Sequence, residues 1–387
     1  MTTKIQKELA FSEGEYRGRV SAVQEILAER GVDAVLVFQI HNMNYLTGYQ
    51  TVGQNNYQFV LVPRSGEPTL FLRRLEGDLG RYYTPFEDIV VWEDDEDPVE
   101  LTRSLLEEKR IASGHLGYEG TSPSFTTRVF ASLKNALPGA EWSDQAGIVE
   151  EGRMIKSPAE IEYIRRSART TEAGMQAAIE AIRDGASEND VAAAGAAATI
   201  AAGSEPLTMS PILTSGPRSA VAHTSFLRRK LEKGDTVLLE WTGSYYRYSA
   251  PLMRSAVVGK PPERLQGMWN VLIEALEAAI AVIRPGVTSG EADAACTAVI
   301  EKAGLYDNYR KRLGYSVGVG FPPDWGNGHI IDLKRGDTRE LATGMVFHMP
   351  PALRVDGIWG FGLSETILVT DGGCEVITKF SRELAVR

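Results

Sequence analysis

The segment DTVLLEWTGSYYRYSAPLMR, Asp235–Arg254, gives the strongest single indication of both fold and chemistry in this chain. Its apolar run Thr236–Glu240 predicts a buried strand that ends in a carboxylate. An ionised carboxylate at such a position is costly unless it is paired or used in catalysis. Because burial disfavours the charged form, Glu240 is a candidate base near neutral pH. The alternative is a carboxylate that turns to solvent where the strand emerges.

A second carboxylate and two of the five histidines lie in comparable contexts. Glu365 stands near the start of the apolar run Leu363–Ile367. His223 precedes the predicted strand Thr236–Glu240, and His348 lies within a further predicted strand, Met345–Met349. Both histidines can face a cleft between two halves of a sheet, although a lone histidine is otherwise a satisfied or solvent-exposed side chain. Together with Glu240 they form a candidate acid/base site.

Aromatic side chains mark candidate pocket walls. The loop FPPDWG, Phe321–Gly326, joins tandem prolines, which stiffen the backbone, to an Asp-Trp pair. Asp324 and Trp325 suit a small cation through the carboxylate charge and the indole face, whereas the alternative is a rigid surface turn. Tyr248 belongs to a tyrosine cluster in which alternation along a strand lets at most half of the rings line one pocket. Tyr45 lies in a polar and aromatic run that follows an N-terminal strand, and it is a candidate for another wall.

Composition restricts the class of protein. A chain of 387 residues is too long for one ordinary core, so two domains are expected. The net charge of −10 argues against nucleic acid or an anionic membrane as a partner. No uninterrupted apolar run approaches the roughly 20 residues that span a bilayer, and the first residues contain no signal-peptide core. Two cysteines, Cys296 and Cys374, are too few for a disulfide framework, and we expect a cytoplasmic protein.

Local patterns predict an α/β N-terminal domain followed by a second domain with an internal repeat. Strands are predicted at Ala34–Phe38, Tyr57–Pro63 and Pro68–Arg73, among helices. In the second domain Ile182–Ser187 resembles Ile283–Thr288, and each run connects two predicted helices. A glycine-led strand start follows each run, so two helix–helix–strand units indicate an internal duplication. The alternative is coincidence, because helix–Pro/Gly–helix links are common.

Four runs resemble the peptidase family of the pita-bread fold, which includes methionine and Xaa-Pro aminopeptidases, prolidases and creatinase. They are Asn42–Gly48, Met154–Arg166, Gly344–Phe347 and Thr366–Glu375. The resemblance covers essentially the whole chain. It implies a creatinase-type α/β N-terminal domain over residues 1–148. It also implies an α+β pita-bread catalytic domain with internal duplication over residues 150–387.

The resemblance also implies that the metal site of this family has been lost. The five metal ligands of the metal enzymes fall here on Glu240, Pro251, Tyr315, Pro350 and Ser364. Only one of these residues is acidic, whereas two tightly bound metals need about five anionic or imidazole ligands. We therefore expect no metal and no cofactor. A mononuclear site built from His223, Glu240 and His348 is the metal-dependent alternative.

Within the family, two metal-free groups are similar to this chain. The catalytic histidine of creatinase matches His223, but the glutamates that grip creatine fall on Met253 and Ser364. Patterns of the ectoine hydrolases correspond to Leu239–Glu240, Arg247–Pro251, Gly314–Gly318, Phe321–Gly326 and Phe347–Pro351. The ectoine hydrolases carry two acids before the last strand. The matching run Gly360–Glu365 keeps only the second of them.

The resemblance implies metal-independent hydrolysis of a non-peptide C–N bond in a small zwitterion, with ectoine as the leading candidate. Glu240 would activate water or attack the amidine carbon, His223 or His348 would protonate the departing nitrogen, and Glu365 would orient a histidine or the water. The expected substrate-binding residues are Tyr315, Asp324, Trp325, Tyr248 and Tyr45. A homodimer is implied, in which the N-terminal domain of one subunit closes the pocket of the other. The alternatives are another amidine or guanidino hydrolase, an osmolyte lyase, or an inactive pita-bread module that binds a partner.

Overall fold

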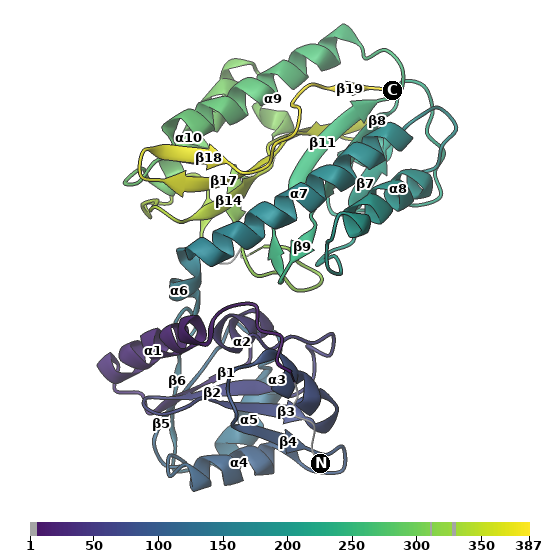
Figure 1. Ribbon diagram of the computed structural model, residues 1–387. Helices are drawn as coiled ribbons and strands as arrows, with labels where there is room; N and C mark the ends of the chain where they lie inside the picture. Colours follow the sequence, from purple (N-terminus) through teal and green to yellow (C-terminus); the bar gives the residue numbers. More distant parts are fainter. Residues whose placement is uncertain (1–5, 310–311, 327–329) are drawn as a thin grey trace. The chain divides into compact units, whose positions relative to one another are not determined.

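The computed structural model describes residues 6–309, 312–326 and 330–387. The chain forms two compact units, Met1–Arg153 and Met154–Arg387 (Figure 1). The boundary expected between residues 148 and 150 lies beside α6 (Glu150–Met154), the short helix in which the first unit ends. His329, one of the five histidines, lies outside the described residues.

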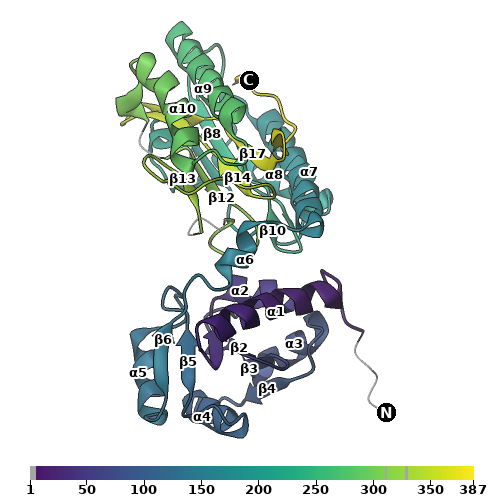
Figure 2. The same ribbon diagram turned by 90° about the vertical axis from the view of Figure 1, so that its left-hand side faces the viewer.

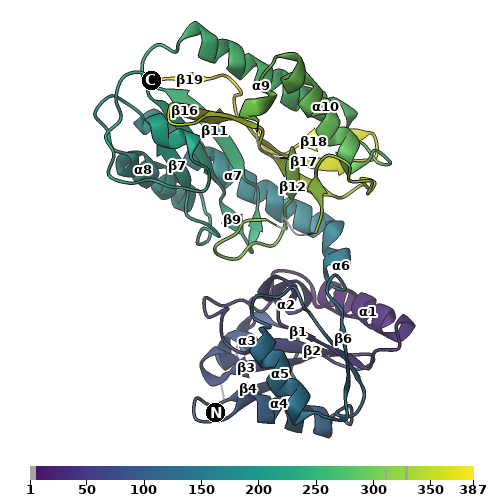
Figure 3. The same ribbon diagram turned by 180° about the vertical axis from the view of Figure 1, so that it is seen from behind.

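The first unit is a six-stranded mixed sheet with helices on it, in the strand order β4-β3-β2-β1-β5-β6. Its strands are β1 (Ala34–Val37), β2 (Phe59–Pro63), β3 (Thr69–Arg73), β4 (Ile89–Trp92), β5 (His115–Tyr118) and β6 (Glu141–Asp144). Its helices are α1 (Glu13–Glu29), α2 (Ile40–Thr47), η1 (Arg74–Glu76), α3 (Gly77–Tyr83), α4 (Pro98–Glu108) and α5 (Thr127–Ala136). Leu106 of α4 and Leu133 of α5 pack with Leu36, Phe59 and Phe71 of the sheet. Figure 3 shows α5 in front of this sheet. The three predicted strands are therefore confirmed.

The second unit contains two sheet halves, ordered β19-β11-β8-β7 and β13-β12-β14-β17-β18 (Figure 2). The first half comprises β7 (Ile212–Ser215), β8 (Thr236–Trp241), β11 (Leu252–Val257) and β19 (Ala385–Val386). The second comprises β12 (Gly314–Ser316), β13 (Asp332–Leu333), β14 (Val346–Met349), β17 (Glu365–Thr370) and β18 (Gly373–Val376). The unit also contains two separate two-stranded hairpins. One pairs β9 (Ser244–Tyr245) with β10 (Tyr248–Ser249), and the other pairs β15 (Ala352–Val355) with β16 (Trp359–Gly362).

One pair of helices covers each sheet half of this unit. These are α7 (Pro158–Ala181) with α8 (Glu188–Ala201), and α9 (Glu263–Val282) with α10 (Ser289–Lys302); the short helices η2 (Gly216–Ala220) and η3 (Tyr306–Asn308) complete the unit. Met175 of α7 packs with Leu239 of β8, whereas Trp269 of α9 packs with Phe347 of β14. Each helix pair therefore buries its own sheet half, which is the layered arrangement that the pita-bread resemblance implies.

The predicted internal duplication is visible in matching backbone hydrogen bonds. The Gly185 N–H donates to the Leu231 carbonyl at 2.9 Å, and the Gly286 N–H donates to the Leu341 carbonyl at 2.9 Å. Both glycines have a left-handed φ, 79° and 84° respectively, which an L side chain rarely adopts. The helix N-caps and the glycines that start the strands correspond in the same way: Ser187 with Thr288, and Gly234 with Gly344.

One helix of the second unit, α9, has the length and composition of a membrane span, with a mean hydropathy of 1.3 over an 18-residue window. The core helix of a globular unit meets the same criterion. Trp269, Leu272 and Leu276 are fully buried in the cluster beneath α9. The helix also carries the charged residues Glu274 and Glu277. We therefore assign α9 to the core of its unit.

Candidate active site

A cleft of about 790 Å³ opens in the second unit. Five of the predicted site residues line it: His223, Glu240, Tyr315, Asp324 and Trp325. Glu240 lies in β8 of the first sheet half, Tyr315 lies in β12 of the second, and the other three lie outside the strands, so only the folded unit brings them together. A cleft of this size holds a small molecule. It is the candidate active site.

Strand alternation aims Glu240 into the cleft. Along β8, Leu239 and Trp241 point into the core beneath α7 and α8, and Leu238 and Glu240 line the cleft instead. Glu240 pairs across the sheet with Met253 of β11, and the strand continues one residue beyond it. The carboxylate is only 8% exposed, so its exposed atoms face the cleft and not bulk solvent. The alternative of a carboxylate turned to bulk solvent does not hold.

Tyr315 connects the cleft to His348. The Trp325 indole Nε1–H donates to Tyr315 Oη at 2.8 Å, and Tyr315 Oη lies 3.0 Å from His348 Nδ1. The other imidazole nitrogen, Nε2, lies 2.7 Å from Ser364 Oγ. His348 is fully buried and does not line the cleft, although its Nδ1 is 4.0 Å from Glu240 Oε1. A ligand in the cleft therefore meets Tyr315 and not His348.

The tyrosine hydroxyl keeps its proton in this setting. Burial raises the pKa of Tyr315 well above its usual value, and the nearby charge of Glu240 raises it further. Hydrogen bonding from Trp325 acts in the opposite direction. Tyr315 is therefore a hydrogen-bond donor throughout the neutral pH range.

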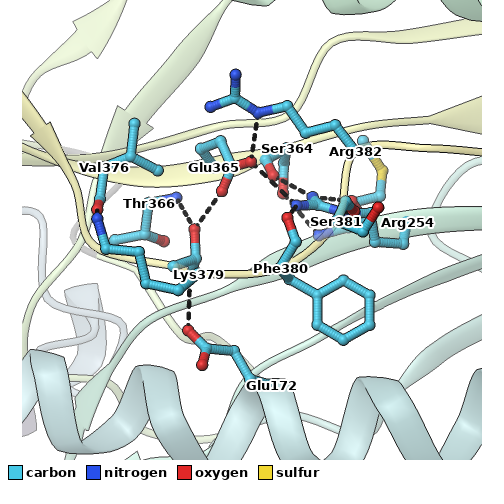
Figure 4. A network of polar contacts seen from close by, with 12 residues as sticks. Glu172, Arg254, Ser364, Glu365, Thr366, Val376, Lys379, Phe380, Ser381 and Arg382 are labelled. Atoms are coloured by element: carbon cyan, nitrogen blue, oxygen red, sulfur yellow. Dashed lines mark hydrogen bonds and ion pairs between the residues drawn. The ribbon is translucent and has the colours of Figure 1, made fainter.

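Glu365 lies outside the cleft, in a buried ion pair (Figure 4). Its Oε1 accepts from Arg254 Nη2 at 3.0 Å, and both side chains are 1% exposed. The Nε–H of Arg382 donates to the same oxygen at 2.9 Å, and the Thr378 hydroxyl donates to Oε2. The physical reason is alternation along extended chain, because Glu365, the first residue of β17, and Ser364, the residue before it, point to opposite faces. Ser364, and not Glu365, contacts His348. The contact that could orient this histidine, predicted for Glu365, is therefore made by the preceding residue.

His223 stands on the cleft wall just after η2 and is exposed. Its backbone has φ 56°, in the left-handed region. Few non-glycine residues adopt this conformation, and such strained positions cluster at functional sites. Of the two predicted histidines, His223 is the one that a ligand in the cleft can touch.

The cleft carries both signs of charge. Asp324 is half-buried, and one of its carboxylate oxygens accepts the Gly326 N–H at 3.0 Å. Arg312 lies with its guanidinium 5.1 Å from the centre of the Tyr315 ring and pairs with Asp332 at 3.0 Å. Arg354 is a further lining cation. Neither arginine was predicted as a site residue, because neither falls in a recognisable motif and only the fold brings them to the cleft.

Two predicted substrate-binding tyrosines have structural partners. The Tyr248 hydroxyl donates to Glu160 Oε1 at 2.8 Å, and the ring is 1% exposed and does not line the cleft. Tyr45 belongs to the first unit, where its hydroxyl donates to the Gly152 carbonyl at 3.0 Å. The Arg19 guanidinium lies 4.2 Å from the centre of the Tyr45 ring. Substrate contact by Tyr45 stays a prediction.

The residues at the family's metal positions do not suit a metal pair. Proline side chains carry no ligand atom, and a tyrosine and a serine hydroxyl are poor substitutes for carboxylate and imidazole. No three His, Cys, Asp or Glu side chains come together as a metal-binding group in the part of the chain that the structure describes. His348 already uses both ring nitrogens, towards Tyr315 and Ser364. The mononuclear set of His223, Glu240 and His348 is therefore not assembled among these residues.

The missing acid of the run Gly360–Glu365 has a local explanation. A Cβ at Gly362 would lie 2.4 Å from Met253 Cε and 3.0 Å from Ala352 Cβ. The thioether of Met253 thus fills the space that a side chain at residue 362 would occupy. Met253 packs with Trp325 and Leu238, which both line the cleft, so the space behind this part of the cleft wall is apolar.

Residues 162–371 match the family described as metallopeptidase family M24, and residues 19–155 match the creatinase/prolidase N-terminal domain. Among curated proteins, the ectoine hydrolase of Halomonas elongata is 31% identical over 99% of this chain and 100% of its own length. The Xaa-Pro dipeptidase of Pyrococcus horikoshii is 27% identical over 95% of this chain and 98% of its own.

Solved structures show the same architecture. The prolidase from Pyrococcus horikoshii has a TM-score of 0.84 at 26% identity, and the match covers 95% of this chain and 99% of the prolidase chain. An Xaa-Pro dipeptidase from Bacillus anthracis has a TM-score of 0.85 at 23% identity, and the match covers 96% of this chain and 100% of the dipeptidase chain. The predicted creatinase-type and pita-bread domains are confirmed.

Proposed function

The chain belongs to metallopeptidase family M24, a family of hydrolases, and we propose that within it this protein is a metal-independent hydrolase of a cyclic amidine, with ectoine as the substrate. The observation that carries the proposal is the buried carboxylate of Glu240, which faces a cleft with both signs of charge and stands where the metal enzymes hold a ligand. Full-length similarity to an ectoine hydrolase supports the substrate. Similarity to Xaa-Pro dipeptidases supports only hydrolysis, because the family resemblance places Pro251, Tyr315, Pro350 and Ser364 at four of the five metal-ligand positions.

The charges of the cleft suit a zwitterion. Ectoine carries a delocalised amidinium cation and a carboxylate on one small ring. Asp324 offers a carboxylate and Trp325 an indole ring face to the cation. Arg354 and Arg312 offer guanidinium groups to the carboxylate. A neutral dipeptide bond would use neither of these charges at the reacting carbon.

Glu240 begins the reaction. As a base it takes a proton from water, whose oxygen forms a bond to the amidine carbon, while the C=N π electrons move onto nitrogen. His223, in its protonated form, then gives a proton to one nitrogen as the C–N bond breaks. The hydroxyl proton passes to the departing amine as the carbonyl forms, and the proton that Glu240 took returns to His223 through solvent. The net change is amidinium plus water to amide plus ammonium. In the alternative step, Glu240 attacks the carbon directly, the C–N bond breaks as His223 protonates the departing amine, and water cleaves the resulting acyl imidate to the amide and the free carboxylate.

A related amidine or guanidino compound is the second candidate substrate. The observation that favours it is Gly362, where the ectoine hydrolases carry an acid and where Met253 fills the space in this chain. An inactive binding module is the third reading of the lost metal ligands. A module without catalysis has no need of a buried carboxylate in its cleft, which favours an enzyme.

A substrate panel tests the proposal. We expect the purified protein to convert ectoine to acetylated diaminobutyrate, detected by mass spectrometry as the addition of one water. Creatine and an Xaa-Pro dipeptide serve as matched comparisons, and we expect neither to react. Turnover of the dipeptide but not of ectoine would contradict the proposal. Absence of reaction with a panel of amidines would favour the binding module.

We also propose that the protein acts as a cytoplasmic homodimer on a small zwitterion, without nucleic acid or membrane as a partner. The net charge of −10 supports the exclusion of polyanionic partners. Sedimentation of the purified protein tests the dimer, and a monomer at micromolar concentration would exclude it.

A further inference from the structure

A continuous chain of polar groups runs from the cleft into the core. The Trp325 indole donates to Tyr315 Oη at 2.8 Å, and Tyr315 Oη lies 3.0 Å from His348 Nδ1. His348 Nε2 lies 2.7 Å from Ser364 Oγ, which also accepts the Met253 N–H at 2.6 Å. Each of these groups has a fixed number of hydrogens and lone pairs, so the direction of every bond can be worked out.

Ser364 fixes the tautomer of His348. The Ser364 oxygen accepts the Met253 N–H. Among the residues that the structure describes, His348 Nε2 is the acceptor within reach of the Ser364 hydroxyl hydrogen. If Nε2 carried the proton instead, the buried serine hydrogen would lack an acceptor, which is costly in the core of a protein. Nε2 is therefore the acceptor, and the neutral ring carries its hydrogen on Nδ1.

The tautomer of His348 in turn fixes the direction of the tyrosine hydroxyl. Tyr315 Oη accepts two hydrogens, one from His348 Nδ1 and one from Trp325 Nε1. Both lone pairs of the oxygen are then occupied, so the hydrogen of Tyr315 points away from these partners. Tyr315 lines the cleft together with Glu240. The cleft is where this hydrogen finds an acceptor.

We infer that Tyr315 is a catalytic hydrogen-bond donor to an amidine nitrogen of the substrate, and that His348, Ser364 and Trp325 are positioning residues that aim its hydroxyl. This inference rests on the proposed amidine hydrolysis. A protonated amidine has N–H groups and no available lone pair on nitrogen. A lone pair appears there only when the carbon becomes tetrahedral, so the hydrogen bond forms in the transition state and not in the substrate complex. Such an interaction raises kcat and leaves KM nearly unchanged.

The acidity of Tyr315 agrees with donation of a hydrogen bond without transfer of the proton. Burial and the charge of Glu240 raise the pKa of this tyrosine well above its usual value. The phenol therefore retains its proton, and proton transfer to the departing nitrogen stays with His223. Tyr315 would act as the donors of an oxyanion hole act, because a preorganised hydrogen-bond donor points at electron density that develops during the reaction.

The tautomer can be measured without any substrate. In protein labelled with ¹⁵N-histidine, we expect His348, assigned by its loss in His348→Gln, to show a protonated Nδ1 and an unprotonated Nε2 near neutral pH. A protonated Nε2, or a doubly protonated ring, would overturn the inference. This outcome is independent of ectoine, so it does not depend on the proposed function.

Kinetics test the catalytic role, provided that the wild-type protein hydrolyses ectoine. We expect Tyr315→Phe to lower kcat about 100-fold with KM little changed. Ser364→Ala should lower kcat about tenfold, Ser364→Thr should restore it, and Ser364→Ala should have no further effect in the Tyr315→Phe background. The matched control is Tyr306→Phe, which removes an exposed hydroxyl outside the cleft. A raised KM with unchanged kcat in Tyr315→Phe would overturn the inference. Full additivity of the two substitutions would do the same.

Discussion

We expect Glu240→Gln to lower kcat for the proposed ectoine hydrolysis by at least about 1,000-fold, the upper part of the range for loss of a general base. Glutamine has the shape of glutamate but neither the charge nor the basicity to take a proton from water or to attack a carbon. The loss is therefore expected under both versions of the first step. Because Glu240 lies at the cleft and not in the helix-packed core, we expect the fold to survive the substitution.

The matched control for this experiment is Glu340→Gln, which removes the same charge from an exposed position of the same unit. Its kcat should equal that of the wild type. Thermal unfolding of both variants should match the wild type as well, which separates lost chemistry from lost structure. A Glu240→Gln variant with a rate within tenfold of the wild type would exclude Glu240 as base and as nucleophile.

Arg254→Met is expected to have the largest effect on stability. Arg254 donates to the carboxylate of Glu365 and to the carbonyls of Met253 and Ser364, and it also reaches the carbonyls of Phe380 and Ser381 (Figure 4). The substitution leaves Glu365 as a buried charge with fewer partners. Breaking a buried pair on one side costs about 3–5 kcal/mol of the free energy of unfolding. Urea denaturation, monitored by tryptophan fluorescence, measures this loss.

The control is Arg335→Met, because Arg335 pairs with Glu301 at 2.9 Å on the surface of the same unit. Exposed pairs contribute little, so we expect its denaturation midpoint to stay close to that of the wild type. An Arg254→Met variant as stable as this control would show that the buried pair does not hold β11, β17 and the C-terminal segment together.

Local chemistry explains why much of the fold was predictable. The repeated runs at Ile182–Ser187 and Ile283–Thr288 combine a left-handed glycine with a helix N-cap, and both features depend on only a few adjacent residues. Likewise, Glu240 was identifiable because a carboxylate interrupts an apolar strand. These signals need no knowledge of distant contacts.

The remaining site assignments depended on three-dimensional facts. Ser364, the residue just before β17, contacts His348, whereas Glu365, the first residue of β17, faces Arg254. Burial of His348 behind Tyr315 is likewise invisible in the sequence, because a histidine in a strand can point to either face. Arg354 reaches the cleft only through the packing of a hairpin.

The central claim is that a carboxylate, and not a metal, activates the attack on the substrate. The most direct test measures the rate of ectoine ring opening against the metal bound per chain, as metal is removed by dialysis against a chelator. We predict that kcat stays constant while the metal content falls far below one atom per chain. A rate that falls in proportion to the bound metal, and returns when metal is added back, would contradict the claim.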